Sequence, residues 1–187
     1  MEKTLTCVVF LCLIAYNIIF TKAQTKAVNL IDFTCKQAPD YNICASILNS
    51  DPRSRSAQDM KALATILMDH VNDKARSTQH HIETLFNDPK TDSKTKINLR
   101  YCIGSYGMIV GTWIQAAKAK IANNEYSRAK DYIYSIRLSV EMCERNFAWL
   151  GHIKSPITDD SKAVDDIAIA VNGVVTYKIT HPSPPMN

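Results

Sequence analysis

Apolar residues recur in steps of three and four along most of the chain, which is the spacing of one face of an α-helix. The regularity is clearest in residues 125–150 and recurs in residues 57–87 and 158–178, whereas no segment alternates in the two-residue period of a strand. The pattern therefore predicts an all-α protein. The apolar positions are, in chain order, Met60, Ala64, Leu67, Val71, Ala75, Thr78, Ile82 and Leu85; Ala129, Ile133, Ile136, Val140, Cys143, Phe147 and Leu150; and Ala163, Ile167, Ala170, Val174 and Tyr177.

Helix-breaking residues divide this pattern into elements. We expect two short helices over residues 28–38 and 41–50, a linker at Asp51-Pro52-Arg53-Ser54, and long helices over residues 57–87, 92–122, 125–150 and 158–178. Ser56 with Asp59, and Thr158, are the predicted N-caps of the first and last long helices. The prediction is an up-and-down four-helix bundle preceded by a short N-terminal helical hairpin.

The first residues have the composition of a secretory signal peptide. Lys3 is followed by an apolar run over residues 5–20 and by Thr21-Lys22-Ala23, a small-residue cleavage site. A membrane anchor is the alternative, but the run is too short to span a bilayer. We therefore expect a secreted protein divided into a signal peptide (1–23), a helical hairpin and linker (24–55), a four-helix bundle (56–180) and a Pro-rich tail (181–187).

Removal of residues 1–23 leaves four cysteines, an even number that in a secreted protein predicts two disulfides with three possible connectivities. Spacing selects among the three. Cys35 and Cys44 flank a turn at residues 38–40, so they can pair locally. Cys102 and Cys143 lie at almost equal distances from Asn123-Asn124, a natural turn between two antiparallel helices. We therefore predict that Cys35 pairs with Cys44 and Cys102 with Cys143.

Charge and motifs argue against several functions. The formal net charge is +4, and loss of Glu2, Lys3 and Lys22 leaves +3, with the remaining cations spread among acids, so nucleic acid is not an expected partner. The chain has no Gly-x-Ser-x-Gly, Gly-rich phosphate loop or His-Glu-x-x-His. No glutamate after residue 23 has a histidine three positions later, as a di-iron bundle requires. We expect neither enzyme activity nor a cofactor or metal.

Two adjacent pairs of ionisable residues have simple explanations. The first pair, His80-His81, cannot chelate one ion because neighbouring helical residues point about 100° apart. It is either a solvated helix edge or a pH-sensitive contact. The second pair, Asp165-Asp166, is explained by the positive start of its helix.

Three glycines form one stripe on the helix predicted over residues 92–122. Gly104, Gly107 and Gly111 lie roughly opposite Cys102, and each helix-interior glycine costs about 1 kcal/mol relative to alanine. Either another segment of the chain, such as the N-terminal hairpin, packs closely on the stripe, or the stripe is a flat docking surface for a protein partner.

Taken together, the signal peptide, the paired Cys35 and Cys44, the Asp51-Pro52-Arg53-Ser54 linker, the paired Cys102 and Cys143, and Ser155-Pro156 before the last helix resemble the plant invertase and pectin methylesterase inhibitors. The resemblance covers essentially the whole chain after residue 23. It implies a secreted, non-catalytic protein that binds a cell-wall or vacuolar carbohydrate enzyme one to one and occludes its active-site cleft. It also implies the disulfide pairing deduced from spacing.

The resemblance leaves two targets open. Invertase inhibitors commonly carry Pro-Lys-Phe at the tip between the second and third bundle helices, where this chain has Asn124-Glu125-Tyr126-Ser127-Arg128-Ala129. Pectin methylesterase inhibitors are thought to lay bundle helices across the pectin-binding cleft, which suits the glycine stripe. We therefore favour pectin methylesterase over invertase. A receptor ligand and a carrier of a small apolar ligand are more distant alternatives.

Overall fold

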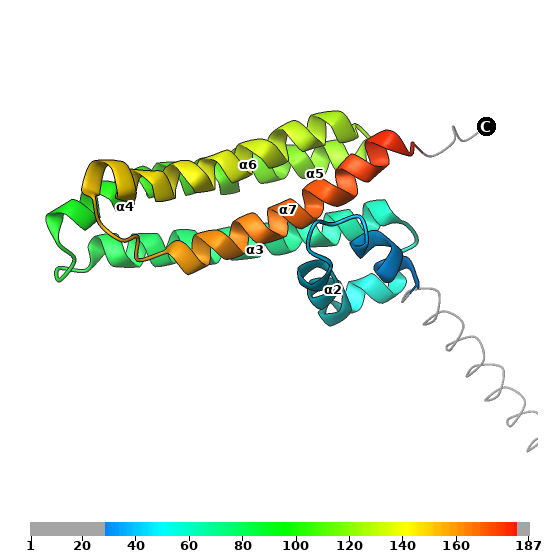
Figure 1. Cartoon of the computed structure of the whole chain (residues 1–187), viewed down its shortest axis with the longest axis horizontal. Coiled ribbons are helices and arrows are strands. Elements are labelled where there is room, and N and C mark those ends of the chain that lie inside the picture. Colours follow the sequence, from blue (N-terminus) through cyan, green and yellow to red (C-terminus); the bar gives the residue numbers. More distant parts are fainter. Residues whose placement is uncertain (1–28, 183–187) are drawn as a thin grey trace, which may run out of the picture.

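The computed structural model describes residues 29–182 and is helical over most of that range, with no strand among those residues (Figure 1). The predicted signal peptide and residues 183–187 of the predicted tail lie outside the described residues. A first helical segment covers residues 29–35. It is followed by α2 (Tyr41–Ser50), the 3₁₀ helix η1 (Pro52–Ser56), α3 (Met60–Asn87), α4 (Ser93–Met108), the π-helical segment η2 (Ile109–Trp113), α5 (Ile114–Ala122), α6 (Tyr126–Asn146), the π-helical segment η3 (Phe147–Gly151) and α7 (Thr158–Thr180).

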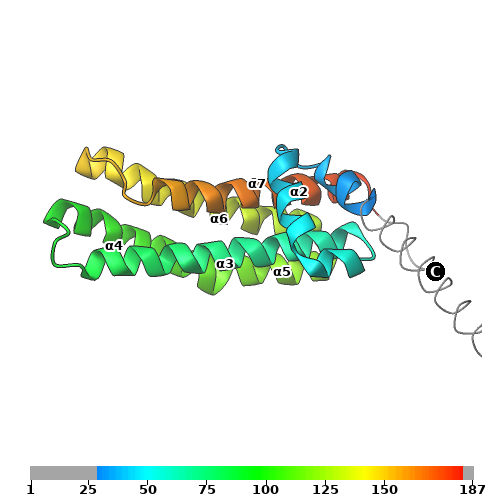
Figure 2. The same cartoon turned by 90° about the horizontal axis from the view of Figure 1, so that it is seen from below.

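The long helices run lengthwise beside one another, and the short N-terminal helices pack against one end of the bundle (Figures 1 and 2). The segments α4, η2 and α5 follow one another without a break and act as a single long bundle helix, antiparallel to α6. The prediction of an all-α bundle preceded by a helical hairpin, with two disulfides, is confirmed. The π-helical segment within the second bundle helix was not predicted.

Burial follows the predicted apolar pattern in α3 and α6. Every predicted position from Met60 to Ile82 is buried, and Leu85 is half-buried against the same core. In α6 and η3 the positions from Ala129 to Phe147 are buried as well, and the predicted position Leu150 lies outside the residues whose side chains are described. The 3.6-residue periodicity therefore located the core-facing side of both helices.

In α7 the predicted core-facing positions were only partly right. Ala170 and Val174 are buried, but Ala163, Ile167 and Tyr177 are half-buried. Because α7 packs against α3, α6 and α2, a wide arc of its surface is covered. Small and branched residues occupy that whole arc, so the sequence is equally compatible with several choices of the apolar stripe. The buried stripe contains Ser161, Val164, Ala168, Val171 and Val175.

Both predicted N-caps are wrong. Asp59 alone caps α3 by accepting a hydrogen bond from Ala62 N at 2.8 Å, whereas Ser56 ends η1 and donates to the Arg53 carbonyl. Thr158 is the first residue of α7, the N-cap position is occupied by Ile157, and the Thr158 hydroxyl donates to Glu144 Oε2 at 3.0 Å.

The segment predicted as a linker is an ordered 3₁₀ helix held by ion pairs. Asp51 is buried, caps η1 through the Arg53 amide, and pairs with the Arg53 guanidinium at 2.7 Å. Arg53 also reaches Asp69 on α3 at 2.6 Å, and Lys118 on α5 contacts the same carboxylate. The hydrogen bonds from Arg53 hold the pKa of the Asp51 carboxyl well below its usual range, although burial opposes this. His70 Nε2 lies 3.0 Å from Asp51.

Gly173 marks the place where the N-terminal hairpin meets the bundle. A Cβ at this position of α7 would lie 2.8 Å from Pro39 Cδ and 2.9 Å from Ala38 Cα, and it would clash with the Gln37 carbonyl oxygen. Only glycine allows the hairpin turn to approach α7 this closely. The contact between the hairpin and a glycine is therefore at Gly173 and not at the glycine stripe.

Candidate docking surface

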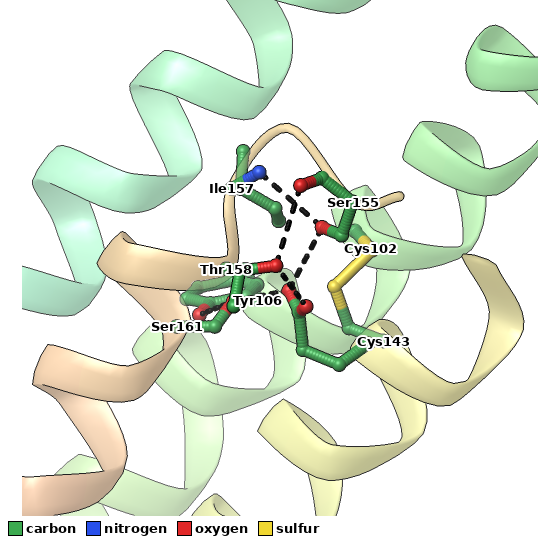
Figure 3. The surroundings of a disulfide bond; sticks show 8 residues. Cys102, Tyr106, Cys143, Ser155, Ile157, Thr158 and Ser161 are labelled. Atoms are coloured by element: carbon green, nitrogen blue, oxygen red, sulfur yellow. Dashed lines mark hydrogen bonds between the residues drawn. A yellow bond between two sulfur atoms is a disulfide. The ribbon is translucent and has the colours of Figure 1, made fainter. Parts of the chain in front are cut away.

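The disulfide between Cys102 and Cys143 joins α4 to α6 and fixes how these two helices face each other (Figure 3). The two Cα atoms are 4.8 Å apart and both side chains are fully buried. The second disulfide, Cys35 with Cys44, closes the N-terminal hairpin. The structure therefore contains the pairing that spacing and the family resemblance both favoured.

A cluster of hydroxyl groups beside this disulfide converges on the carboxylate of Glu144. Ser155 and Ser161 donate to Oε1 at 3.0 and 2.8 Å, and Thr158 donates to Oε2 at 3.0 Å. The buried Tyr106 hydroxyl donates to Ser161 at 3.2 Å, and burial raises the pKa of this phenol above its usual value. Figure 3 shows the hydroxyls of α4, α7 and the segment before α7 meeting at one corner.

This cluster has a structural role. Every serine and threonine hydroxyl in it donates to the Glu144 carboxylate, so the cluster links α6 to the start of α7 and to the segment before it. Sequence reasoning missed this cluster: Ser155 was noted only for the Ser155-Pro156 pair and Thr158 only as a predicted N-cap, and nothing pointed to Glu144 as the acceptor.

The glycine stripe faces solvent. Gly104, Gly107 and Gly111 are all exposed, and a Cβ added at any of them would meet no atom within 4 Å. The expectation that another part of the described chain packs on the stripe is therefore wrong. The docking explanation remains a proposal.

The hairpin tip, residues 123–128, is the other predicted contact region. Asn124 adopts a left-handed backbone conformation with φ 59°, as a tight Asn-Asn turn requires. Glu125 pairs with Lys120 at 2.8 Å, and the hydrogen bond from Lys120 lowers the pKa of this carboxyl. Tyr126 is half-buried and donates to Asn124 Oδ1 at 3.0 Å. Arg128 is exposed.

A shallow groove of about 290 Å³ separates this tip from the end of α7. Its wall on the α7 side comprises Lys178, Ile179 and Pro182, and the Lys178 ammonium lies 5.7 Å from the centre of the Tyr126 ring. Most of the tip side chains are therefore engaged by their own chain, and the two predicted contact regions lie at different places on the molecule.

Both histidines of the His80-His81 pair are exposed, as the explanation of a solvated helix edge predicts. His81 Nδ1 also lies 2.7 Å from Asp160 Oδ2 on α7, beside the ion pair of Lys74 with the same carboxylate. Hydrogen bonds from Lys74 and His81 hold the pKa of Asp160 below its usual value. Residues 29–182 contain no group of three or more histidines, cysteines or acids placed to hold a metal ion.

Comparison with known proteins identifies the family. A model of the family described as "Plant invertase/pectin methylesterase inhibitor" matches residues 29–176. The chain belongs to this family. The match covers the N-terminal hairpin and nearly all of the bundle, so the predicted family resemblance is confirmed.

Three curated members of the inhibitor family are similar in sequence. The chain is 31% identical over 140 residues to cell wall / vacuolar inhibitor of fructosidase 1 of Arabidopsis thaliana, an alignment that covers 75% of this chain and 64% of that protein. It is 25% identical to inhibitor of fructosidase 2 of the same plant over 72% of this chain and 74% of that protein. It is 26% identical to a pectinesterase inhibitor of Actinidia deliciosa, over 78% of each chain. The chain thus spans less than two thirds of the first of these relatives.

Solved structures support the fold. A mutant form of a pectin methylesterase inhibitor from Arabidopsis superposes with a TM-score of 0.63 at 17% identity, covering 76% of this chain and 92% of that one. A second pectin methylesterase inhibitor from Arabidopsis thaliana gives a TM-score of 0.58 at 16% identity, over 78% and 93% of the two chains. The members named here are inhibitors of carbohydrate-active enzymes and not enzymes themselves. No helix within residues 29–182 is both long and apolar enough to cross a membrane.

Proposed function

We propose that the protein is a secreted inhibitor of a plant pectin methylesterase, which it binds one to one so that the bundle occludes the active-site cleft. In this proposal the contact residues are drawn from the exposed glycine stripe, with Asn124, Glu125, Tyr126 and Arg128 of the hairpin tip as the second candidate region. The protein acts in the cell wall outside the cell.

The observation that carries this proposal is the contrast between the two regions. The stripe of Gly104, Gly107 and Gly111 is open, so the backbone of α4 and η2 can approach another surface closely. The tip has no Pro-Lys-Phe sequence, and its aromatic ring is held against its own chain by Asn124 and Lys178. A side chain held in this way is poorly placed to enter a partner's pocket.

A fructosidase (invertase) is the second candidate target. It is favoured by the 31% identity to a fructosidase inhibitor and by the exposed Arg128, a cation at the tip that forms no ion pair within residues 29–182. In that case the target is a cell-wall or vacuolar enzyme, and the protein acts in the same compartment.

Parallel inhibition assays separate the two candidates. Purified protein lacking residues 1–23 is titrated against one plant pectin methylesterase and one plant acid invertase at mildly acidic pH. Inhibition of the esterase at micromolar protein or below, with the invertase unaffected, is the expected result. Inhibition of the invertase alone would replace the proposal by the second candidate, and inhibition of neither would leave both without support.

A further inference from the structure

Positive charge is concentrated at the end of the bundle that lies away from the N-terminal hairpin. Two segments meet there, the turn from α3 into α4 and the turn from α6 through η3 into α7 (Figures 1 and 2). We call residues 84–100 and 145–157 together the basic end. They contain six Lys and Arg and two Asp, a formal charge of +4, whereas the whole chain after residue 23 carries only +3. The rest of that chain therefore sums to −1.

Five of the six cations of the basic end form no ion pair within residues 29–182. The exception is Arg145, which pairs with Glu141 at 3.2 Å. The Arg100 guanidinium lies 5.6 Å from the centre of the Phe86 ring, a contact that leaves its charge without a counter-charge. The unpaired five are Lys90, Lys94, Lys96, Arg100 and Lys154, and all but the half-buried Lys96 are exposed.

The two acids of the basic end are turned to the backbone. Asp88 accepts a hydrogen bond from the Lys90 amide at 2.8 Å. Asp92 caps α4 by accepting from the amides of Lys94 and Thr95 at 2.9 and 3.0 Å. Neither carboxylate pairs with a Lys or Arg side chain among the described residues, so the ammonium groups beside them stay available to a ligand.

Two of the lysines lie where a helix disfavours them. Lys94 and Lys96 belong to the first turn of α4, which has no acidic residue. The N-terminal end of a helix carries the positive pole of its macrodipole, so a cation there is repelled. The first turn of α7 has the favourable arrangement, with Asp159 and Asp160. Cations kept at an unfavourable position, without a counter-charge from their own chain, indicate a negatively charged ligand.

The spacing of these cations favours an extended ligand. Lys94 and Arg100 are six residues apart on α4, a rise of about 9 Å. Lys90 and Lys154 lie in the two connecting segments beyond the helix ends. A small anion can touch only one or two charges that are separated in this way. A polymer with regularly spaced negative charges can contact most of them at once.

Trp149 in η3 narrows the chemistry of that polymer. Its ring is 62% exposed, and the Arg145 guanidinium lies 3.8 Å from the ring centre. An exposed indole is an apolar plate on which the C–H face of a sugar ring can lie. Four of the five unpaired cations are lysines, which act as point charges and lack the fork geometry that suits phosphate. Sugar rings that carry carboxylates fit this combination.

Resting on the proposed function, we propose that the basic end binds an acidic polysaccharide, a polymer of uronic acid residues with free carboxylates. Hydrolysis of a pectin methyl ester by water releases methanol and a proton and leaves such a carboxylate. The product of the proposed target enzyme therefore carries the charge that the basic end binds. The inhibitor is retained in those parts of the cell wall where the esterase has already acted.

The test measures binding by calorimetry, with protein lacking residues 1–23 and at about pH 6, where uronate carboxylates are ionised. We expect binding to polygalacturonate and none to fully methyl-esterified pectin. The affinity should fall about tenfold or more between about 0.05 M and about 0.2 M NaCl, because each contact releases counterions. In Trp113→Phe, Trp149 is the one tryptophan left, and its fluorescence should change when polygalacturonate is added.

Two triple variants locate the binding surface. Lys90→Gln/Lys94→Gln/Lys154→Gln removes three exposed, unpaired cations, so its Tm should not fall, and binding to polygalacturonate should weaken about tenfold or more. The matched control, Arg55→Gln/Lys61→Gln/Lys130→Gln, removes the same charge from unpaired cations at the other end of the bundle. It should weaken binding by no more than about twofold, since distant charges are screened.

Four outcomes would overturn the inference. Equal losses in the two triple variants would mean that only the net charge matters. Equal binding to methyl-esterified pectin would remove the role of the carboxylates. Unchanged Trp149 fluorescence at saturating polygalacturonate would place the polymer elsewhere. Binding to anionic lipid vesicles without binding to polygalacturonate would make the ligand a membrane. Failure of the unmodified protein to inhibit the esterase is a separate result, which would count against the proposed function and leave polysaccharide binding standing.

Discussion

Replacing the exposed glycines by alanine should stabilise the protein. Gly104 and Gly107 lie inside α4, where glycine costs about 1 kcal/mol relative to alanine because its backbone loses more freedom on folding. A Cβ at either position meets no atom within 4 Å, so nothing offsets this gain. The double variant Gly104→Ala/Gly107→Ala should therefore gain about 2 kcal/mol. At about 2–4 °C per kcal/mol for a chain of this size, its Tm should rise by about 4–8 °C.

Gly173→Ala is the matched control, since it makes the same substitution inside another bundle helix. Its Cβ would come within 2.8 Å of Pro39 Cδ, and crowding of this kind typically costs about 1–3 kcal/mol. The expected result in urea or thermal unfolding is a rise for the double variant and a fall for Gly173→Ala. If the double variant melted at or below the temperature of the unmodified protein, some segment would have to pack on the stripe, and the docking proposal would lose its basis.

Three other substitutions test the scaffold. Cys102→Ser/Cys143→Ser opens a loop with a sequence separation of 41 and should cost about 4 kcal/mol by the loop-entropy relation, measured by urea unfolding. Glu144→Gln replaces one of the two acceptor oxygens by an amide donor facing hydroxyl donors and should cost about 1–3 kcal/mol, measured as a lower Tm. Asp51→Asn should lower stability at pH 6 and flatten its decline in acid. The pKa of Asp51 is lower in the folded protein than its unfolded value of about 3.9. The ionised carboxylate therefore stabilises the fold above that unfolded value, and this stabilisation is lost as the pH falls towards the folded-state pKa.

Matched controls accompany these variants. Tyr126→Ala should cost much less than loss of the disulfide, because the ring is only half-buried. Glu141→Gln changes an exposed carboxylate of the same helix and should shift stability by no more than about 0.5 kcal/mol. Asp73→Asn changes an exposed carboxylate that forms no ion pair within residues 29–182, and it should shift stability by no more than about 0.5 kcal/mol. Equal losses in any matched pair would contradict the corresponding structural role.

The helices and the disulfides could be predicted because each depends on counting along the chain. A 3.6-residue period identifies the buried side of α3 and α6, and equal distances from Asn123-Asn124 bring Cys102 opposite Cys143. The period is least informative where a helix is apolar over a wide arc, which is why the buried stripe of α7 was misassigned.

Contacts between distant segments could not be predicted in this way. Glu144 meets Ser155, Thr158 and Ser161 because the chain reverses after η3, at a residue, His152, with a left-handed backbone. The sequence predicted a reversal between residues 150 and 158 but not which side chains it would bring together. The glycine stripe was visible in the sequence, but whether it faced solvent or another helix depended on the packing of the whole bundle.

The position of the Cys102–Cys143 bond along its helices has a consequence for how the protein opens. At 1.5 Å per residue the bond lies about 29 Å from Asn124 along α6 and about 33 Å along α4 and α5, so the far half of the α5–α6 hairpin has no covalent tie. Fraying should begin at that free end, and amide hydrogen exchange should slow progressively from Asn124 towards the bond. The segment beside the bond, at Tyr101 and Met142, is therefore expected to open last.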